Sequence, residues 1–339
     1  MKKNVLFFIA SLSVALSSCG NKGASNSTET TNESPVEAVQ TTSATVFDCD
    51  PGTDDACAFL LFAKTIGEPD YMISTFGNMP FKYTTRNMNI MAKFLGMNSI
   101  LCQGIGEPSD HHEVTCGDFH GTDGLAGIAD EMAAKYGVTD SMVASNKDLA
   151  YLASEINQKD SVTYIAVGPL STLANLITKY PETLSHIKNV YIMGGGITHF
   201  NKEGQTEYNF AGDGPAVQTV LSSSLDITIF PLDITEVYAG IAKTEIDSMD
   251  FSKYPEMKNI LLQNYASNVK YTKDATGCVI HDCLPVLYYY DKSKFTVKDY
   301  KLVANSIGHI EEAADGKLIH VAMEMEKDFL VNSIKESLK

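Results

Sequence analysis

The pattern of hydrophobic and polar residues is regular along most of the chain. From Thr45 onward, short apolar runs alternate with longer segments in which apolar residues recur at helical spacing. The runs predict buried strands, and the periodic segments predict amphipathic helices. Repeated strand–turn–helix units are typical of an open, mainly parallel sheet with helices on both faces. The sequence therefore predicts a single α/β body over 44–339 without an internal domain boundary.

Gly, Pro and Asn mark the ends of most of these segments. One predicted strand begins at Thr45, and the others are 71–76, 100–103, 162–167, 190–193 and 227–230. Helices are predicted near Asp54, over 83–95 and 149–156, up to Lys179, and over 216–221. After Asp233 the pattern is mostly helical. Asp315-Gly316 then separates Ile310-Glu311 from 318–323, which predicts a small C-terminal hairpin before a last helix.

The first predicted strand leads into an unusual group of acids. Asp48, Asp50, Asp54 and Asp55 surround a Pro51-Gly52 turn, and no Lys or Arg lies between Thr45 and Ala63. Two like charges about 4 Å apart cost on the order of 4 kcal/mol at an effective dielectric near 20. A helix N-terminus offsets only about 0.3–1 kcal/mol per acid. A hard divalent cation held by oxygen ligands fits this group best; the alternative is that Asp54 and Asp55 only cap a helix.

Polar residues follow several other predicted strands. Turns come after Asp50, Phe76, Val167 and Met193. Because the carboxyl ends of parallel strands share one edge of a sheet, we expect these turns to lie together where such folds bind ligands. His281-Asp282 could reach the same edge. The long loop 104–127, rich in Gly, Asp and His, is expected to be functional at that length.

Composition narrows the classes of function. The 339 residues are 44% hydrophobic and 20% charged, which is ordinary for a globular protein. Lys and Arg number 26 against 42 Asp and Glu, and the net charge of −16 argues against nucleic acid as a partner. The cysteines after Cys19 show no disulfide framework and no spacing typical of zinc.

The N-terminus has the features of a targeting segment. Lys2 and Lys3 precede an apolar run over 5–16 that is too short to span a membrane. The following Leu16-Ser17-Ser18-Cys19 resembles the lipobox of bacterial lipoproteins, which implies removal of the signal peptide 1–18 and acylation of Cys19; an ordinary signal peptide is the alternative. Residues 19–43, rich in Ser, Thr, Asn and Gly, predict a disordered tether. We expect an exported protein whose lipid anchor holds it to a membrane, in the periplasm or at the cell surface.

An ordered series of motifs resembles the inosine–uridine-type nucleoside hydrolases. The first is Asp48-Cys49-Asp50-Pro51-Gly52-Thr53-Asp54-Asp55-Ala56, which is specific. The others follow in order as Gly77-Asn78, Thr85-Arg86-Asn87, His120-Gly121-Thr122-Asp123-Gly124-Leu125, Val167-Gly168-Pro169-Leu170, Met193-Gly194-Gly195-Gly196, Glu207-Tyr208-Asn209 and His281-Asp282. The resemblance covers about 45–335, and it implies a Rossmann-like fold and hydrolysis of the N-glycosidic bond of ribonucleosides.

The resemblance also implies roles for individual residues. It implies a Ca²⁺ ion whose ligands are Asp50, Asp55, Asp282 and the carbonyl of Val167, with Asp50 as the general base toward the metal-bound water. Asp54, Asn78, Asn201, Glu207 and Asn209 are the implied ribose-holding set, with Met193 lining the sugar pocket. His281 is similar to the residue that gives a proton to the departing base in some members, whereas His120 receives no catalytic role. Members are often dimers or tetramers, so a homo-oligomer is expected.

Two departures from the family pattern lie beside the implied site. Gly212-Asp213-Gly214-Pro215-Ala216 stands where the family usually has Asp-Pro-Glu-Ala, and Cys283-Leu284-Pro285 follows His281-Asp282 where Pro is commoner. They bear on base specificity and rate more than on the metal site. The base that is preferred stays open at this point.

Two other functions compete with nucleoside hydrolysis. Asp48-x-Asp50 with Gly52-Thr53 and a later Gly212-Asp213-Gly214 also resembles Mg²⁺-dependent phosphatases of the haloacid dehalogenase type, but Pro51 interrupts that motif and Asp54-Asp55 is left unexplained. A lipoprotein could also use the same pocket to capture nucleosides without cleaving them. The acidic pocket, which has no evident Arg clamp, favours nucleosides over nucleotides in either case.

Overall fold

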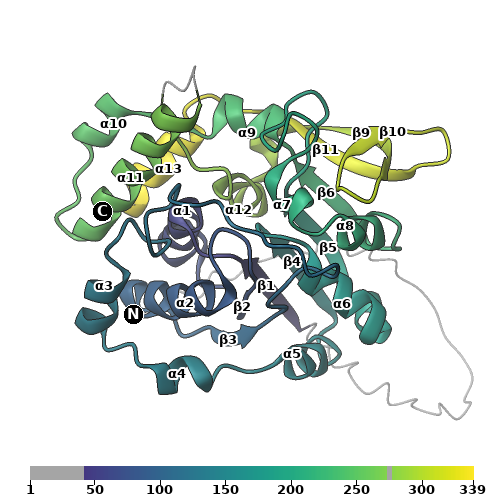
Figure 1. Cartoon of the computed structure of the whole chain (residues 1–339), viewed down its shortest axis with the longest axis horizontal. Helices are drawn as coiled ribbons and strands as arrows, with labels where there is room; N and C mark the ends of the chain where they lie inside the picture. Colours follow the sequence, from purple (N-terminus) through teal and green to yellow (C-terminus); the bar gives the residue numbers. More distant parts are fainter. Residues whose placement is uncertain (1–41, 273–276) are drawn as a thin grey trace, which may run out of the picture. The chain divides into compact units, whose positions relative to one another are not determined.

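A nine-stranded, mainly parallel sheet runs through the part of the chain that the computed structural model describes, which is residues 42–272 and 277–339. The strand order is β10-β9-β11-β6-β5-β4-β1-β2-β3 (Figure 1). The parallel strands are β1 (Ser43–Cys49), β2 (Tyr71–Ser74), β3 (Ile100–Gln103), β4 (Ser161–Ala166), β5 (Ile187–Met193) and β6 (Ile227–Phe230). The predicted signal peptide and nearly all of the predicted tether, with Cys19, lie outside the described residues.

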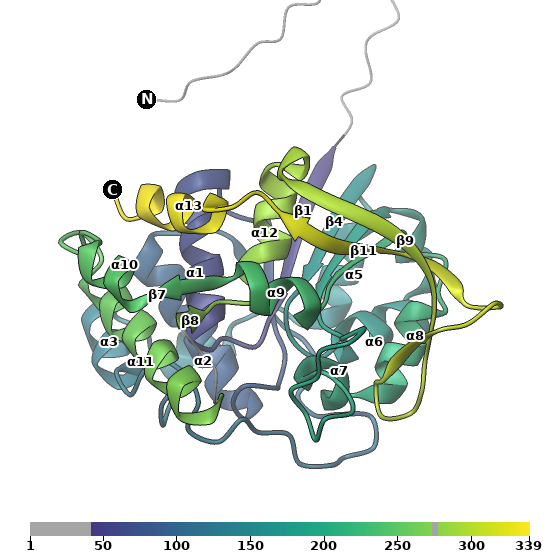
Figure 2. The same ribbon diagram turned by 90° about the horizontal axis from the view of Figure 1, so that it is seen from above.

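Helices cover both faces of this sheet, as Figure 2 shows. One face carries α5 (Leu149–Ile156), α6 (Ser171–Lys179) and α8 (Gly214–Leu221). The other carries α1 (Thr53–Leu61), α2 (Phe81–Leu95), α3 (Ala129–Tyr136), α11 (Pro255–Tyr271), α12 (Cys283–Tyr290) and α13 (Phe329–Ser337). The predicted α/β architecture is therefore confirmed.

The residues of β1 explain why the sheet needs cover on both faces. Val46 and Phe47 are adjacent and fully buried, and they belong to two different apolar cores. Successive side chains of a strand point to opposite faces, so an apolar run such as this one is stable only between two helical layers. Phe47 packs against Phe59 and Phe62, with ring centroids 5.3 and 4.9 Å away, which fixes α1 against the strand that precedes it.

Shorter elements complete the described body. They are α4 (Asp140–Ala144), α7 (Tyr208–Gly212), α9 (Leu232–Tyr238) and α10 (Lys243–Ser248), with a separate two-stranded sheet of β7 (Gly240–Ala242) and β8 (Gly277–Val279). A π-helical turn at Phe62–Ile66 extends α1, and 3₁₀ turns occur at Pro181–Ser185 and Lys292–Lys294. Within the described residues, no helix combines the length and the apolar character needed to cross a membrane.

The C-terminal hairpin forms with a different pairing from the one that the sequence predicted. β10 (Ile310–Glu312) and β11 (Lys317–Met325) do not pair with each other, because both pair antiparallel with β9 (Phe295–Ala304), which lies between them. β9 was not predicted: three charged residues, Lys298, Asp299 and Lys301, interrupt its apolar alternation. β11 pairs parallel with β6, so this antiparallel unit extends the main sheet.

Candidate active site

The acids of the first motif lie where β1 ends and α1 begins. The chain turns at Asp50–Gly52, and the Asp55 carboxylate accepts a hydrogen bond of 2.8 Å from the backbone N–H of Gly52. This bond caps the helix N-terminus, so the simpler capping role holds for Asp55 at one of its two oxygens. Asp54 makes no such bond within the turn, and capping alone does not account for it.

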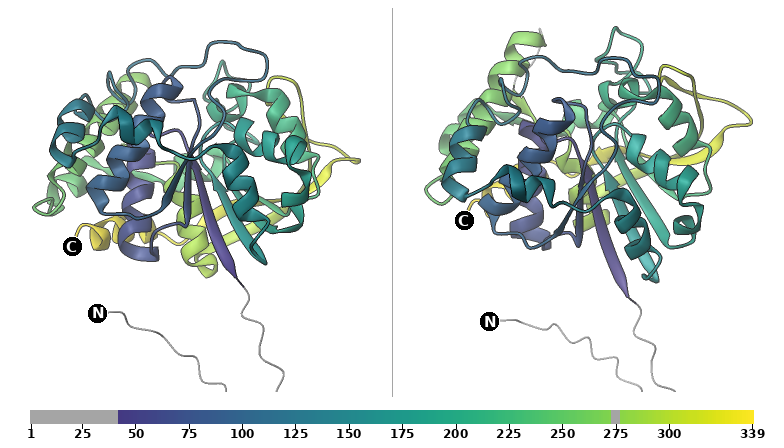
Figure 3. Two further views of the ribbon diagram at one scale, coloured as in Figure 1. Left: turned by 90° about the horizontal axis from the view of Figure 1, so that it is seen from below. Right: turned by 60° about the horizontal axis from the view of Figure 1, so that its bottom comes forward.

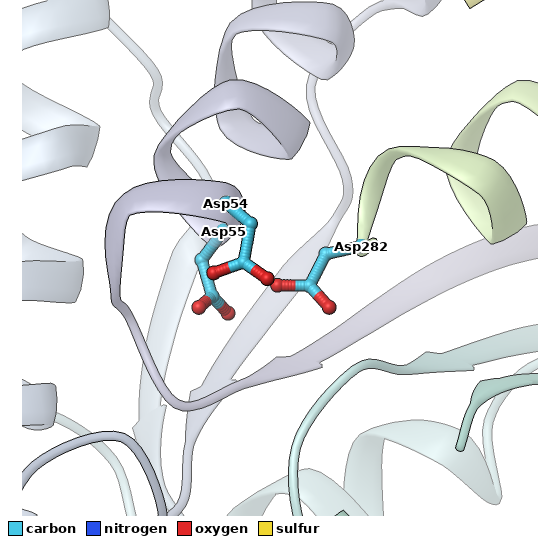
Figure 4. Close-up of side chains that lie close together, drawn as sticks. All are labelled: Asp54, Asp55 and Asp282. Atoms are coloured by element: carbon cyan, nitrogen blue, oxygen red, sulfur yellow. The ribbon is translucent and has the colours of Figure 1, made fainter. Parts of the chain in front are cut away.

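Asp54, Asp55 and Asp282 converge at the sheet edge (Figure 4). Each offers one carboxylate oxygen, and these three oxygens lie within 4.8 Å of one another. The first two side chains come from the start of α1 and the third from the start of α12, more than two hundred residues later. The structure therefore places Asp282 at the same edge as the first motif, which the sequence had left open.

Each of these carboxylates, like that of Asp50, has one buried oxygen without a hydrogen-bond partner. Among the described residues, no Lys or Arg pairs with them, and the nearest ionisable base in an ion-pair contact is His120, whose Nδ1 is 3.7 Å from Asp54. The buried oxygens without a partner are Asp50 Oδ1, Asp54 Oδ1, Asp55 Oδ1 and Asp282 Oδ2. A buried charge without compensation is costly, and a hard cation that takes carboxylate oxygens is the compensation that this donor set fits.

Asp50 lies beside this group. Its Oδ2 accepts a 2.8 Å hydrogen bond from the backbone N–H of Asn78, and the Asn78 amide reaches the Asp50 carbonyl at 3.2 Å and Asp55 Oδ2 at 3.1 Å. Two glycines make room for the Asp50 carboxylate: a Cβ would lie 2.0 Å from it at Gly77, whose φ is +149°, and 2.8 Å from it at Gly168. The turns after β2 and β4 can therefore close directly on Asp50.

The electrostatics follow from burial and crowding. Burial raises the pKa of Asp50 well above its ordinary value, and the Asp55 charge adds to the shift. Burial followed by repulsion from Asp54 and Asp55 does the same to the pKa of Asp282. Burial, again with repulsion from Asp55, raises the pKa of Asp54 to about 7. Without a cation the cluster therefore retains protons at neutral pH, and a bound cation would release them.

Polar residues of α7 and of the turns after β4 and β5 form a second part of the site. Glu207 begins α7, and its carboxylate accepts hydrogen bonds from the backbone N–H groups of Gly195, Asn209 and Phe210 at 2.8–3.0 Å. The Asn209 amide donates to the Val167 carbonyl at 2.8 Å and lies 3.3 Å from Met193 Sδ. The turns after β4 and β5 thus meet α7, as the sequence predicted for this edge.

Asn201 is not part of this buried group. Its side chain is exposed, and its Oδ1 accepts a 2.9 Å hydrogen bond from the backbone N–H of Tyr208. In this conformation Asn201 caps the start of α7, while Asn78 and Asn209 are buried beside the carboxylates.

Two buried histidines flank the acids. His120 Nδ1 accepts a 3.0 Å hydrogen bond from the backbone N–H of Thr53, so its proton sits on Nε2. His281 Nδ1 lies 2.8 Å from Thr235 Oγ1. Burial lowers the pKa of His120 to about 3 and that of His281 to about 4, so both rings are neutral at pH 7.

Sequence reasoning gave no role to several residues that close the site. Besides His120, they are Thr53, Cys116, Tyr208 and Asn264. The Tyr208 hydroxyl donates to the Gly77 carbonyl at 3.1 Å, and the Cys116 thiol contacts the Asn78 carbonyl. His120, Cys116 and Tyr208 lie within or next to motifs that the sequence had already singled out, so their place near the site could have been predicted. Nothing in the sequence marked Asn264, whose amide donates to Thr53 Oγ1.

The loop 104–127 contacts Asn78 and Thr53 beside the acids, and it is fixed near both ends. The buried Asp213 carboxylate accepts hydrogen bonds from the N–H and hydroxyl of Ser109, at 2.9 and 2.6 Å, and from the Ser171 hydroxyl at 2.6 Å. Further along, the Phe119 carbonyl accepts a hydrogen bond from Ser267 of α11. Through these hydrogen bonds the loop contacts both helical layers.

Comparisons with known proteins agree with this geometry. Residues 45–331 match the family model described as inosine-uridine preferring nucleoside hydrolase. A non-specific ribonucleoside hydrolase of Klebsiella pneumoniae is 28% identical over 255 residues, 75% of this chain and 81% of that protein. The inosine-uridine preferring nucleoside hydrolase of Crithidia fasciculata is 27% identical over 263 residues, 75% of this chain and 80% of that protein. The structure of a purine-preferring ribonucleoside hydrolase from Gardnerella vaginalis has a TM-score of 0.76 at 19% identity, covering 87% of this chain and 97% of that one, and it shares the fold.

The carboxylate cluster should make metal-free protein less stable as pH rises. The pKa values of Asp54 and Asp55 are raised to about 7 and about 6, while both ionise near 4 in an unfolded chain. Between about pH 4 and pH 7 the folded state thus holds protons that the unfolded state has lost, and the free energy of unfolding must fall over this window. Denaturant unfolding in EDTA across these pH values measures the fall.

Asp282→Asn should flatten that pH dependence, because it removes one repelling charge and breaks no capping hydrogen bond. A divalent cation at about 100 times its dissociation constant should stabilise the parent protein by about 2.7 kcal/mol at pH 7.5 and the variant much less. Asp247→Asn, at an exposed carboxylate of α10, is the matched control and should behave as the parent. Equal cation stabilisation of the parent and Asp282→Asn would exclude a metal site here.

Proposed function

The chain belongs to the inosine-uridine preferring nucleoside hydrolase family, and we propose that it hydrolyses the N-glycosidic bond of ribonucleosides with the help of a calcium ion. One observation carries the proposal. Asp54, Asp55 and Asp282 bring carboxylate oxygens within 4.8 Å of one another at the carboxyl edge of the sheet, and these residues and the neighbouring Asp50 each have a buried oxygen without a hydrogen-bond partner. Such an arrangement can hold a cation and a polyhydroxylated sugar side by side.

The residues that would hold the ion are Asp50, Asp55, Asp282 and the Val167 carbonyl, with Asp54 close enough to contribute. When bound, calcium neutralises these acids and lowers the pKa of a water in its coordination shell. The Val167 carbonyl already accepts one hydrogen bond from Asn209, which leaves its second lone pair for the ion.

Asp50 is placed to act as the general base. Its Oδ2 is fixed by the Asn78 N–H, whereas its Oδ1 is buried and has no partner. In the proposed reaction Oδ1 takes a proton from water as the water oxygen bonds to C1′ of the ribose. The N-glycosidic electron pair leaves with the base, which takes a proton from the ring N–H of His281; solvent then reprotonates His281 as Asp50 gives up the proton that it accepted.

The ribosyl group gains positive charge as this bond breaks. Preorganised carboxylates stabilise such charge best when they do not have to move. Glu207 is held by three backbone N–H groups, and Asp54 is held at the start of α1. Asn78 and Asn209 offer amides to the sugar hydroxyls from two sides of the cluster.

Two alternatives are less well supported. A haloacid dehalogenase-type phosphatase would leave Asp55 and its convergence with Asp282 unexplained. Capture of a nucleoside without cleavage would not need an unpartnered Asp50 oxygen beside the cluster. Calorimetry with inosine, combined with chromatography, separates the second alternative: binding without release of free base would indicate a capture protein.

We also propose that Cys19 is acylated and that the exported protein is tethered through residues 19–43. β1, the purple strand in Figure 3, begins at Ser43 and ends just before Asp50, so its first residue lies at the sheet edge opposite the acids.

Turnover should require both Asp50 and the ion. Asp50→Asn keeps the size of the side chain but removes the proton acceptor, and kcat for inosine and uridine should fall by about 10²–10⁴. EDTA should abolish base release and Ca²⁺ should restore it. Asp247→Asn is again the control, and full activity of the metal-free parent would contradict the calcium assignment.

His281 should matter most for bases that leave poorly. Because its pKa is lowered to about 4, it is neutral in the metal-free protein and can help only through the proton on one ring nitrogen. His281→Ala should reduce kcat for inosine by about 10²–10⁴ and that for p-nitrophenyl riboside, whose leaving group needs no proton, far less. Equal losses with both substrates would remove this residue from the chemistry.

Nucleosides should be better substrates than nucleotides. The site is lined by acids, and among the described residues no Arg or Lys pairs with them. The kcat/KM for inosine should exceed that for inosine 5′-phosphate by at least about tenfold, because a phosphate would meet like charge. A higher kcat/KM for the nucleotide would overturn this specificity.

A further inference from the structure

The turn between β9 and β10, residues 305–309, lies against the segment that carries Glu207 and Asn209. Figure 2 shows this turn beside α7 and α8. The turn is about one hundred residues away in the sequence and contributes no residue to the site described above. The contact is continuous from Gln205 to Gly214.

Two glycines allow the backbones to touch. At Gly214 a Cβ would lie 2.1 Å from the Ser306 carbonyl oxygen. At Gly308, whose φ is +78°, a Cβ would lie 2.2 Å from the Phe210 carbonyl oxygen. Real Cβ atoms do not approach oxygen so closely, so any larger residue at either position would push the turn and the α7 segment apart.

Specific hydrogen bonds join the same two segments. The Thr206 hydroxyl donates to the Gly308 carbonyl at 2.9 Å, and Thr206 is buried. His309 Nδ1 donates to the Gln205 carbonyl at 2.6 Å. The turn is itself rigid, because Asn305 Oδ1 accepts hydrogen bonds from the backbone N–H groups of Ile307 and His309.

The contact extends to Glu207 from its other side. Ile310 is buried, and its Cδ1 lies 2.9 Å from where a Cβ of Gly195 would be. The N–H of Gly195 donates to Glu207 Oε2 at 3.0 Å. The turn and the first residue of β10 thus support both the residue before Glu207 and one of the three donors that fix its carboxylate.

Gly214, which makes this contact, also lies in one of the two segments that depart from the family pattern. The usual residue there is Pro, whose ring the backbone of 306–308 would not admit. A proline would also restrict the backbone by itself.

We propose that the β9–β10 turn is a positioning element for ribose recognition, acting through Thr206 on Glu207 and Asn209. The proposal rests on the proposed function of the site. It assigns Thr206 and Gly308 a role in sugar binding although neither touches the sugar. The metal-holding acids are supported by other elements, α1, α12 and the turn after β2, so cation binding should be independent of this contact.

Thr206→Val tests the proposal, because it keeps the shape of the side chain and removes the hydroxyl. We expect a KM for inosine raised about tenfold, a similar loss of affinity for free ribose in calorimetry, and kcat within about threefold of the parent, since one hydrogen bond contributes roughly tenfold in an equilibrium. The Ca²⁺-induced rise in Tm should be unchanged. Thr206→Ser, which restores the hydroxyl, should return KM and ribose affinity to parent values.

Two controls separate positioning from general damage. Thr178→Val removes a hydroxyl bond within α6, and Gly240→Ala adds a methyl group where nothing lies within 4 Å. Both should leave KM unchanged, whereas Gly308→Ala should raise it. An unchanged KM in Thr206→Val with an active parent would overturn this proposal alone. A parent that releases no base and binds no ribose would overturn the proposed function together with it.

Discussion

Repulsion among buried carboxylates is the constraint on which the rest of this structure depends. Asp50, Asp54, Asp55 and Asp282 meet in a place without a nearby Lys or Arg, and only neutral groups approach them closely. The fold brings these residues together. Asp50, Asp54 and Asp55 lie between the carboxyl end of β1 and the start of α1, and Asp282 lies at the start of α12, near the other end of the chain. The apolar cores on both faces of the sheet contribute the stability that offsets this repulsion.

Some of these groups serve the fold and the chemistry together. Asp55 caps α1 with one oxygen and faces the cluster with the other. Glu207 caps α7 and stands in the wall that faces the acids. Fixing a carboxylate by backbone N–H groups costs the protein little extra, because helix N-termini have unpaired N–H groups in any case. The same bonds prevent the carboxylate from turning away when charge develops nearby.

Much of the fold and part of the site could be predicted from the sequence. The central strands have simple apolar runs and clear turn residues, and the motifs at their ends placed Asp50 and Val167 at one edge, whereas the position of Asp282 was left open. β9 was missed because its charges break the alternation, and the pairing of β10 and β11 was consequently wrong. A strand pattern reports which face a residue occupies but not which partner strand lies beside it.

The positions of individual side chains within the site could not be predicted from the sequence. Motif order could not show that Asp54 converges with Asp55 and Asp282, or that Asn201 caps α7 in this conformation, because both depend on side-chain directions set by packing. Likewise, His120 became a neighbour of Asp54 only through its bond to Thr53, sixty-seven residues away.

The two halves of the site are held in different ways. The acids are held at helix starts and by backbone hydrogen bonds, including those of Asn78 and the start of α12, which lie far from β1 in the sequence. The α7 segment is held instead through Asp213, which joins the loop 104–127 to α6, and through the β9–β10 turn, which contacts Thr206. The departure from the family pattern at Gly212-Asp213-Gly214 lies at this second set of contacts, where Gly214 touches Ser306. A change in the β9–β10 turn would therefore move the α7 segment more than it would move the acids.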